Sequence, residues 1–347
     1  MINDTKLSLC MICKNEAEHI QTCIRSVKQL VDEIIVVDTG SQDHTRELAR
    51  AEGGIIYDFP WSDNFAAARN FALDQAAGQW ILVLDADEIL TNADREYLNS
   101  LIQSPQIEGY YVTICSYVGK GEATIIDQAV RLFKNKPFYR FRGAIHEQIA
   151  ASIQEHTGVT GLGFASLTIK HCGYLDKEKA VKNKPARNVA IIKRALDNTP
   201  DDPFLLYSLG IEYMQAGNWG GSAAQFKHAL RFLRGCEGYF PHVLTMLGAA
   251  LLRINAKEEL AGLLANALIM LPDNTDLHLL RGMLAYAEQE YELVITELEP
   301  VIEQESDILP QSSILKVLGD AYRLTGHIEA ARQQYTKILQ LAAKPQP

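Results

Sequence analysis

Trp80-Ile-Leu-Val-Leu-Asp-Ala-Asp87 is the stretch that decides the fold of the N-terminal half. Its unbroken apolar run is typical of a strand that is covered on both faces of a parallel sheet. Two carboxylates follow, and residues two apart in an extended chain project to the same side. We therefore expect Asp85 and Asp87 to approach one ligand together. In open α/β sheets, ligands bind at this carboxyl end of the strands.

Two earlier segments have the same character. Leu7-Ser-Leu-Cys-Met-Ile12 and Glu33-Ile-Ile-Val-Val-Asp38 are short apolar runs separated by amphipathic segments. This alternation predicts a Rossmann-related α/β domain, with a mostly parallel sheet covered by helices. Asp38 closes the second run, as Asp85 and Asp87 close the later one. The sequence thus places the chemistry in a domain that covers residues 1–175.

The C-terminal part has helical periodicity and an internal repeat. Glycines recur at intervals of about 34 to 38 residues, at Gly210, Gly248, Gly282 and Gly319. A large residue follows each glycine by sixteen positions, at Phe226, Leu264, Leu298 and Tyr335. The pattern resembles the tetratricopeptide repeat, whose period is about 34 residues. We expect such repeats over residues 203–343 and a linking helix over 176–202, with an irregular all-α bundle as the alternative.

Composition excludes several classes of protein. Lys and Arg number 33 against 43 Asp and Glu, so the formal net charge of −10 repels nucleic acid unless a basic patch is set apart. The opening residues lack a signal-peptide pattern, and the longest apolar stretch, 261–271, is shorter than the roughly 20 residues that span a bilayer. We expect a cytoplasmic protein with no nucleic-acid partner, no transmembrane anchor and reduced cysteines.

Taken together, the N-terminal motifs resemble glycosyltransferase family 2, whose catalytic domain has the GT-A fold. The resemblance lies in Leu7–Glu16, in Ile34–Ser41 with Asp43 and Thr45 beyond it, and in Asp85-Ala-Asp87. It implies that sugar is transferred from a nucleotide sugar with inversion of the anomeric centre. The Q-x-x-R-W signature of processive polysaccharide synthases is absent, so we expect a single sugar to be added per event. A UDP-sugar is the favoured donor. The base stays open, because Asp38-Thr-Gly40 stands where many members have two acids.

The resemblance assigns a role to each residue of the site by position. The nucleotide-sugar site would be formed by Cys13, Glu16, Asp38, Arg69, Asp85 and Ala86. Asp38 would contact the base, Glu16 the base or ribose region, and Asp85 the ribose. Asp87 would bind Mn²⁺ or Mg²⁺, because hard cations prefer carboxylate oxygens. An isolated Asp-x-Asp is as readily a solvated strand end, so the context carries this assignment.

Trp61–Asn70 resembles a segment of the repeat-bearing members and of lipopolysaccharide-core transferases. Arg69 would face the donor diphosphate, because a guanidinium donates a fork of hydrogen bonds to anionic oxygens. The alternative is a helix that packs through Phe65, Ala68 and Ala72, with Arg69 pointing to solvent.

A later motif, Arg131-Leu-Phe133 followed by Gly143-Ala-Ile-His-Glu147, resembles the same branch and supplies the candidates for acceptor chemistry. Glu147 is the candidate general base, because an inverting transferase needs a proton acceptor beside the nucleophile. Other members usually present Glu-Asp at this point. His171 would complete the metal shell, with His146 as the competing ligand. Either histidine could instead satisfy a structural hydrogen bond.

The acceptor and the assembly stay open. Stacked repeats form concave surfaces that suit extended peptides, and the layout resembles the bacteriocin S-glycosyltransferases, so we expect a peptide or protein acceptor. A lipid-linked or lipopolysaccharide acceptor is one alternative, and an inactive scaffold that binds partners through its repeats is another. The clustered charges of the site argue against a scaffold, because such clusters are costly to keep. The sequence allows a homodimer without requiring one.

Overall fold

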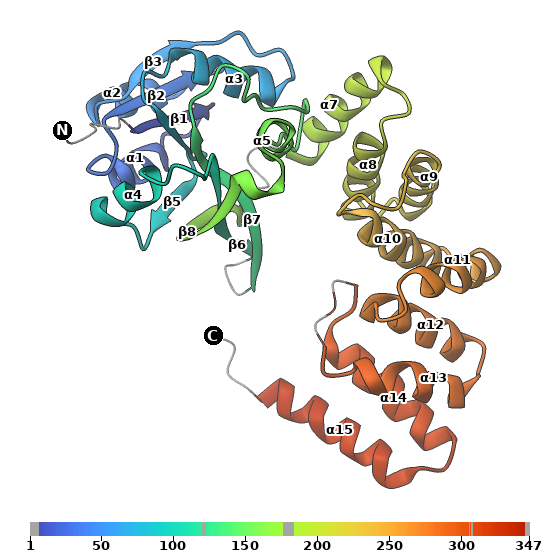
Figure 1. Ribbon diagram of the computed structural model, residues 1–347. Helices are drawn as coiled ribbons and strands as arrows, with labels where there is room; N and C mark the ends of the chain where they lie inside the picture. Colours follow the sequence, from blue (N-terminus) through green and yellow to red (C-terminus); the bar gives the residue numbers. More distant parts are fainter. Residues whose placement is uncertain (1–6, 120–122, 176–183, 305, 307, 344–347) are drawn as a thin grey trace. The chain divides into compact units, whose positions relative to one another are not determined.

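The computed structural model describes residues 7–119, 123–175, 184–304, 306 and 308–343. The chain forms two compact units, Met1–Arg187 and Asn188–Pro347 (Figure 1). Over the described residues the first unit combines a sheet with helices, and the second is helical, as the sequence predicts. Within the predicted link over 176–202, residues 176–183 lie outside the described residues, and helix α7 (Lys184–Asn198) occupies most of the rest. No helix in the described part is long and apolar enough to cross a membrane.

The first unit contains one eight-stranded sheet in the order β3-β2-β1-β4-β7-β6-β8-β5. Its strands are β1 (Leu7–Cys13), β2 (Glu33–Asp38), β3 (Ile55–Asp58), β4 (Trp80–Val83), β5 (Glu88–Thr91), β6 (Gly109–Gly119), β7 (Ala123–Lys134) and β8 (Leu162–Leu175). Strands β3, β2, β1 and β4 run parallel, whereas β7 is antiparallel to both β4 and β6, and β5 is antiparallel to β8. The sheet is therefore mixed, and its parallel half matches the prediction. Because β1 lies between β2 and β4, the carboxyl ends of these three strands meet at one edge.

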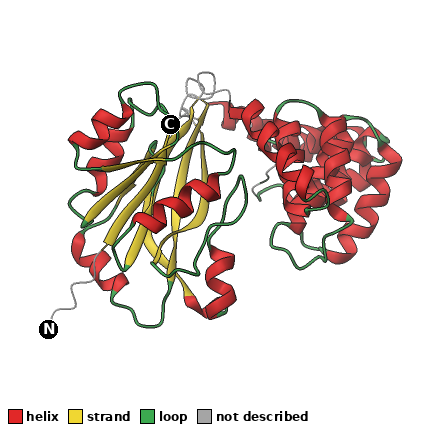
Figure 2. Cartoon of the chain, turned by 90° about the horizontal axis from the view of Figure 1, so that it is seen from above, coloured by secondary structure: helices red, strands yellow, loops and turns green. Residues whose placement is uncertain are grey.

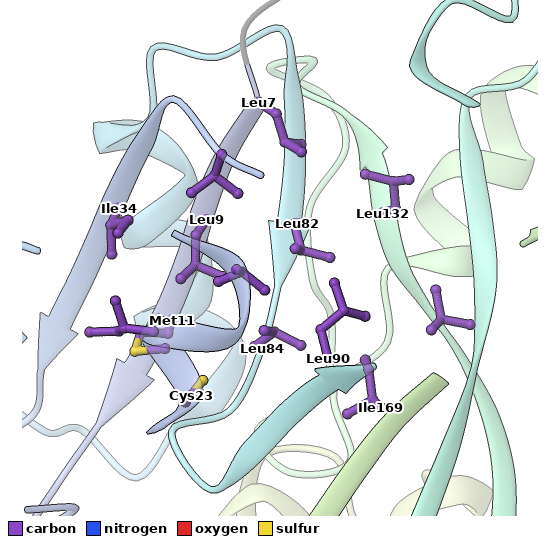
Figure 3. Close-up of a cluster of buried hydrophobic side chains, with 14 of the residues drawn as sticks. Leu7, Leu9, Met11, Cys23, Ile34, Leu82, Leu84, Leu90, Leu132 and Ile169 are labelled. Carbon is purple, nitrogen blue, oxygen red and sulfur yellow. The ribbon is translucent and has the colours of Figure 1, made fainter. Parts of the chain in front are cut away.

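Side-chain alternation along these strands divides the core into two layers. Leu9 and Leu82 belong to one cluster, which Figure 3 shows, whereas Cys10 and Ile81 belong to the other. The first layer includes residues of α1 (Ile20–Val27), α2 (Thr45–Ala51) and α4 (Arg95–Ile102), and the second those of α3 (Phe65–Gln75) and α5 (Ala150–Thr157), which precedes the short η1 (Val159–Gly161). Helices accordingly flank the strands in Figure 2. Cover on both faces explains the continuous apolar runs of β1, β2 and β4.

The second unit consists of consecutive helices. After α7 come α8 (Pro203–Gln215), α9 (Trp219–Leu230), α10 (Phe240–Arg253), α11 (Lys257–Met270), α12 (Thr275–Ala287), α13 (Tyr291–Leu298), η2 (Glu299–Val301), α14 (Gln311–Leu324) and α15 (Ile328–Ala343). Each repeat glycine lies in the first helix of a pair, and its missing side chain lets the second helix approach. A β carbon added to Gly210, Gly282 or Gly319 would lie 2.4, 2.4 or 2.8 Å from the residue sixteen positions later.

Gly248 departs from this rule. The nearest atom to its added β carbon is Cδ1 of Leu280, at 2.5 Å, and Leu264 is not among the nearest contacts. Leu280 belongs to α12, the first helix of the following pair, so here the close approach is between pairs and not within one. The period of the repeat correctly predicts the small residue in all four helix pairs. It correctly predicts the large residue that packs against this glycine in three of them.

We predict that Gly210→Ala destabilises the helical unit by about 1–3 kcal/mol, because overpacking in a closed core forces neighbours to shift. Its methyl group would lie 2.4 Å from the ring of the fully buried Phe226. Gly262→Ala on α11 is the matched control: nothing lies within 4 Å of its added β carbon. This change should stabilise the helix by about 0.5–1 kcal/mol. Urea unfolding of the whole chain measures both, and equal effects would contradict the close helix approach.

Candidate active site

The Asp85-Ala-Asp87 segment connects β4 to β5 as a tight turn. Ala86 and Asp87 are buried, and Asp85 is half-buried. The backbone N–H of Asp85 donates to Oε2 of Glu88 at 2.8 Å, and the N–H of Glu88 donates to the carbonyl of Asp85 at 3.0 Å. These reciprocal bonds hold the turn in one conformation, so the two aspartates are positioned by the protein itself.

Two arginines hold the carboxylate of Asp85 from either side. Arg69 on α3 donates through Nη2 to Oδ1 at 2.8 Å, and Nη2 of Arg131 on β7 lies 3.4 Å from Oδ2. Arg69 also donates through Nε to Glu147, and Arg131 donates through Nη2 to Glu88 at 2.7 Å. Five side chains of alternating charge thus form a row, here named the charge ladder: Glu147, Arg69, Asp85, Arg131 and Glu88.

The loop that carries Glu147 is fastened to α3, and this places Arg69 beside it. The side chain of Asn70 donates to the carbonyl of Phe141 at 3.0 Å and accepts from the N–H of Phe141 at 2.8 Å. The guanidinium of Arg69 lies 5.5 Å from the centre of the Phe141 ring. Arg69 is 7% exposed, so the alternative in which it points to solvent does not hold.

Charge and burial act against each other along the ladder. Burial alone would raise the pKa of Asp85, but Arg69 and Arg131 outweigh it and hold that pKa well below its usual range. Burial raises the pKa of Glu88 to about 7, although Arg131 opposes the rise. Because the two arginines lower its pKa, Asp85 stays ionised at neutral pH. Within the described residues, Nη1 of Arg69 is buried and has no hydrogen-bond partner.

Asp87 and His171 form a second pair next to the ladder. Oδ1 of Asp87 lies 3.4 Å from Nε2 of His171, and Oγ of Ser116 lies 3.4 Å from Nδ1 of the same ring. The β5–β8 pairing sets Glu88 opposite His171 and thereby fixes this approach. Burial would lower the pKa of His171, but Asp87 and the neighbouring acids outweigh it and raise that pKa.

The Asp87–His171 pair fits part of a divalent-cation site. Carboxylate and imidazole are both ligands of such ions, and phosphates and waters commonly complete a shell that the protein only begins. Among the described residues, no three His, Cys, Asp or Glu side chains form a group that could hold a metal ion. His146 is exposed, with a backbone φ of +53°, and the structure does not bring it into such a group. Its role as a ligand stays a prediction.

Asp38 lies at the end of β2 and is buried at 2% exposure. Its carboxylate accepts from the backbone N–H groups of Gly40 and Ser41, at 3.2 and 3.0 Å, and from the thiol of Cys13 at 3.8 Å. These bonds engage Asp38 with its own loop and with β1. A contact between Asp38 and a nucleotide base stays a prediction. The assignment of the buried Cys13 to the nucleotide-sugar site also stays a prediction.

The loops after β1 and β2 are tied together beside Asp38. The N–H of Glu16 donates to the hydroxyl of Thr45 at 2.7 Å, and the N–H of Gln42 donates to the side-chain carbonyl of Asn15 at 2.8 Å. Glu16 is half-buried at this junction. Its assigned place near base or ribose is compatible with these bonds, which use its backbone and not its carboxylate.

Sequence reasoning placed Arg131 within the later motif and Glu88 at the end of the acidic run, but it assigned neither residue a role in the site. Glu88 extends the acidic run that begins at Asp85, and this run was the available signal. Arg131 follows 46 residues after Asp85, and nothing in its local sequence names its partner. Only the pairing of β7 with β4 brings the two together.

We predict that Asp38→Ala lowers the free energy of unfolding by about 1–3 kcal/mol, because the N–H groups of Gly40 and Ser41 lose a buried acceptor. Asp58→Ala is the matched control: it lies opposite Asp38 in the β2–β3 register, but its side chain is 69% exposed. We expect a change within about 1 kcal/mol for this variant. Urea unfolding compares the two. Wild-type stability in Asp38→Ala, combined with weak nucleoside binding, would instead indicate a direct base contact.

Comparison with known proteins places this site in a family. Residues 8–160 match the model of glycosyl transferase family 2. A TPR repeat-containing protein of Synechococcus elongatus is 33% identical over 230 residues, which are 65% of this chain and 57% of that protein. The SPbeta prophage-derived glycosyltransferase SunS of Bacillus subtilis is 25% identical over 219 residues, 60% of this chain and 50% of SunS.

The chain spans 57% and 50% of the length of these two relatives. The crystal structure of MamA covers 47% of this chain and 91% of its own, with 20% identity and a TM-score of 0.40. The family-model match identifies residues 8–160 as a glycosyl transferase family 2 domain, and this segment contains all five residues of the charge ladder.

Proposed function

We propose that this protein transfers a single sugar from a nucleotide-sugar donor, with a UDP-sugar favoured, and that Asp87 and His171 hold a divalent cation, Mn²⁺ or Mg²⁺, for the donor diphosphate. The observation that carries the proposal is the 3.4 Å approach of these two side chains, beside the charge ladder of a family 2 domain. A bound cation would supply positive charge to the leaving diphosphate. Asp85 is engaged by two arginines, and we assign the cation to Asp87 because its Oδ1 faces Nε2 of His171.

Arg69 and Asp85 would bind the rest of the donor. The buried Nη1 of Arg69, which lacks a partner in the described part, would donate to a diphosphate oxygen. Asp85 keeps its charge under the influence of both arginines, so it would accept hydrogen bonds from ribose hydroxyls. In this arrangement the same guanidinium orders the ribose ligand and contacts the phosphates.

Glu147 would act as the general base of an inverting displacement. Its Oε1 accepts from Arg69, which orients the carboxylate, and within the described residues no hydrogen bond to Oε2 is present. That second oxygen would take the proton from the acceptor nucleophile as the sugar is attacked from the opposite side. The bond to the nucleoside diphosphate breaks as the bond to the nucleophile forms, so the diphosphate departs with the bonding electrons, and Glu147 afterwards returns its proton to solvent.

For the acceptor we propose a peptide or protein. The support is the row of helix pairs after the family 2 domain, because repeated pairs present the extended surfaces that such chains bind. Mass spectrometry after incubation with donor and either peptides or lipid-linked glycans distinguishes this acceptor from the alternative. Transfer to the lipid-linked glycans alone would contradict the proposal.

We predict that Asp87→Ala abolishes the Mn²⁺-dependent part of UDP binding while the fold is kept. His171→Ala should raise the Mn²⁺ concentration that binding requires, and excess Mn²⁺ should partly restore it, because one ligand of the cation is lost. Calorimetric titration of UDP at several Mn²⁺ concentrations measures both effects. Asp58→Ala, which removes an exposed acid of the same domain, should bind as wild type does. Unchanged binding by Asp87→Ala would remove Asp87 from the cation site.

We predict that Glu147→Gln lowers turnover on a hydroxyl acceptor by about 10² to 10⁴, the usual contribution of general-base catalysis. Donor affinity should be nearly unchanged, because the amide oxygen can still accept from Arg69. A thiol acceptor should lose less, since a thiol is more acidic than a hydroxyl. Steady-state kinetics test this, with the exposed Glu155→Gln as control. Near-normal turnover on a hydroxyl acceptor would exclude Glu147 as the base.

A further inference from the structure

Glu88 contacts both halves of the cation site. Its backbone begins β5, where it pairs with His171 of β8. Its side chain is 1% exposed and accepts from the N–H of Asp85 through Oε2, at 2.8 Å, and from Arg131 through Oε1, at 2.7 Å. Both oxygens are thus engaged by the protein, so Glu88 is not offered to a cation. It connects the turn that carries Asp87 with the strand that carries His171.

Arg131 supplies the opposite charge from a third strand. Leu132, its neighbour on β7, pairs with Leu82 of β4, so Arg131 reaches the turn just where β4 ends. Its Nη2 lies 2.7 Å from Glu88 and 3.4 Å from Asp85, and its side chain is 13% exposed. Through one nitrogen, β7 therefore fixes carboxylates at both ends of the Asp85–Glu88 turn.

Stability alone does not explain this buried pair. Taking a carboxylate and a guanidinium out of water costs free energy that their attraction only about repays, and apolar residues of similar size often serve a fold equally well. What a buried, hydrogen-bonded pair adds is a fixed direction for each group. Here the groups so fixed are the backbone of Asp85 and the start of β5.

From these contacts we infer that Glu88 and Arg131 are positioning residues for the cation site: their ion pair holds the turn so that Asp87 and His171 face one another. The inference rests on the proposed function, because the ion pair can position cation ligands only if Asp87 and His171 bind a cation. It adds two residues that act on the cation without contacting it. Partners that orient the ligands of a metal commonly change its affinity by about 10- to 100-fold when they are removed.

Arg131→Met tests the inference in the full chain. We expect the Mn²⁺ concentration for half-maximal UDP binding to rise by roughly 10- to 100-fold, measured by calorimetry. Lys134→Met is the matched control, because it removes an ion pair of the same strand, with Glu108 at 3.0 Å, outside the site. This variant should bind as wild type does. Equal Mn²⁺ requirements for Arg131→Met and wild type would overturn the inference.

A double variant separates positioning from mere stability. Glu88→Met with Arg131→Met leaves neither charge unpaired, so urea unfolding should show most of the stability that Arg131→Met loses restored. The raised Mn²⁺ requirement should remain, because the ion pair that holds the turn is absent from the double variant. Restoration of the wild-type requirement would overturn the inference. If Arg131→Met does not fold, the double variant alone provides this test.

The wild-type titration separates the two levels of the proposal. If the wild-type protein binds UDP with the same affinity in the presence and absence of Mn²⁺, the proposed cation site is refuted, and the positioning role is refuted with it. Mn²⁺-dependent binding by the wild type, with an unchanged requirement in the double variant, would refute the positioning role alone.

Discussion

The Arg69 guanidinium is the group on which the arrangement of the site depends. It is buried, and a buried charge is tolerated only when opposite charges and hydrogen bonds compensate it. Asp85 and Glu147 provide that compensation, and they come from the end of β4 and from the loop after β7. Three segments that are remote in sequence are therefore held at one point by one side chain. Arg131 has the same role next to it, because its guanidinium lies between the carboxylates of Asp85 and Glu88.

Most members of the site can be found from the sequence, but not their contacts. The strand ends suggest Asp85 and Asp87, and the family resemblance suggests Glu147 and His171. The structure places Asp87 3.4 Å from His171, and the role of this pair in binding a metal stays a prediction. The Arg69–Glu147 contact spans 78 residues. It depends on the bonds between Asn70 and Phe141, which tie a helix to a distant loop. Local patterns give the elements, whereas such pairings depend on how the elements pack.

The assignments that stay undecided have a similar cause. A resemblance transfers a role to a position, but the hydrogen bonds of Asp38 depend on the turn that follows it, and its carboxylate already serves the N–H groups of that turn. His146 has the right chemistry for a ligand and is nevertheless exposed, on a backbone with positive φ. Leu280 takes the place expected of Leu264 against Gly248, because neighbouring helix pairs also compete for the gap. For Asp38 and for Gly248, a contact that the sequence pattern does not reveal decides the outcome.

The change of strand direction within the sheet is itself part of the site. In the parallel half, every strand reaches the binding edge with its carboxyl end and stops there. Strand β7 runs the other way, and in the described part of the chain it pairs with β4 through Leu132, Phe133 and Lys134. By this register Arg131 lies level with the last residue of β4, beside the Asp85–Glu88 turn, and the residues that precede it on β7 extend past the end of β4. A parallel neighbour that also ended at this edge would offer no strand interior there. The antiparallel half supplies the second guanidinium because of its direction, and β8 supplies His171 through its pairing with β5.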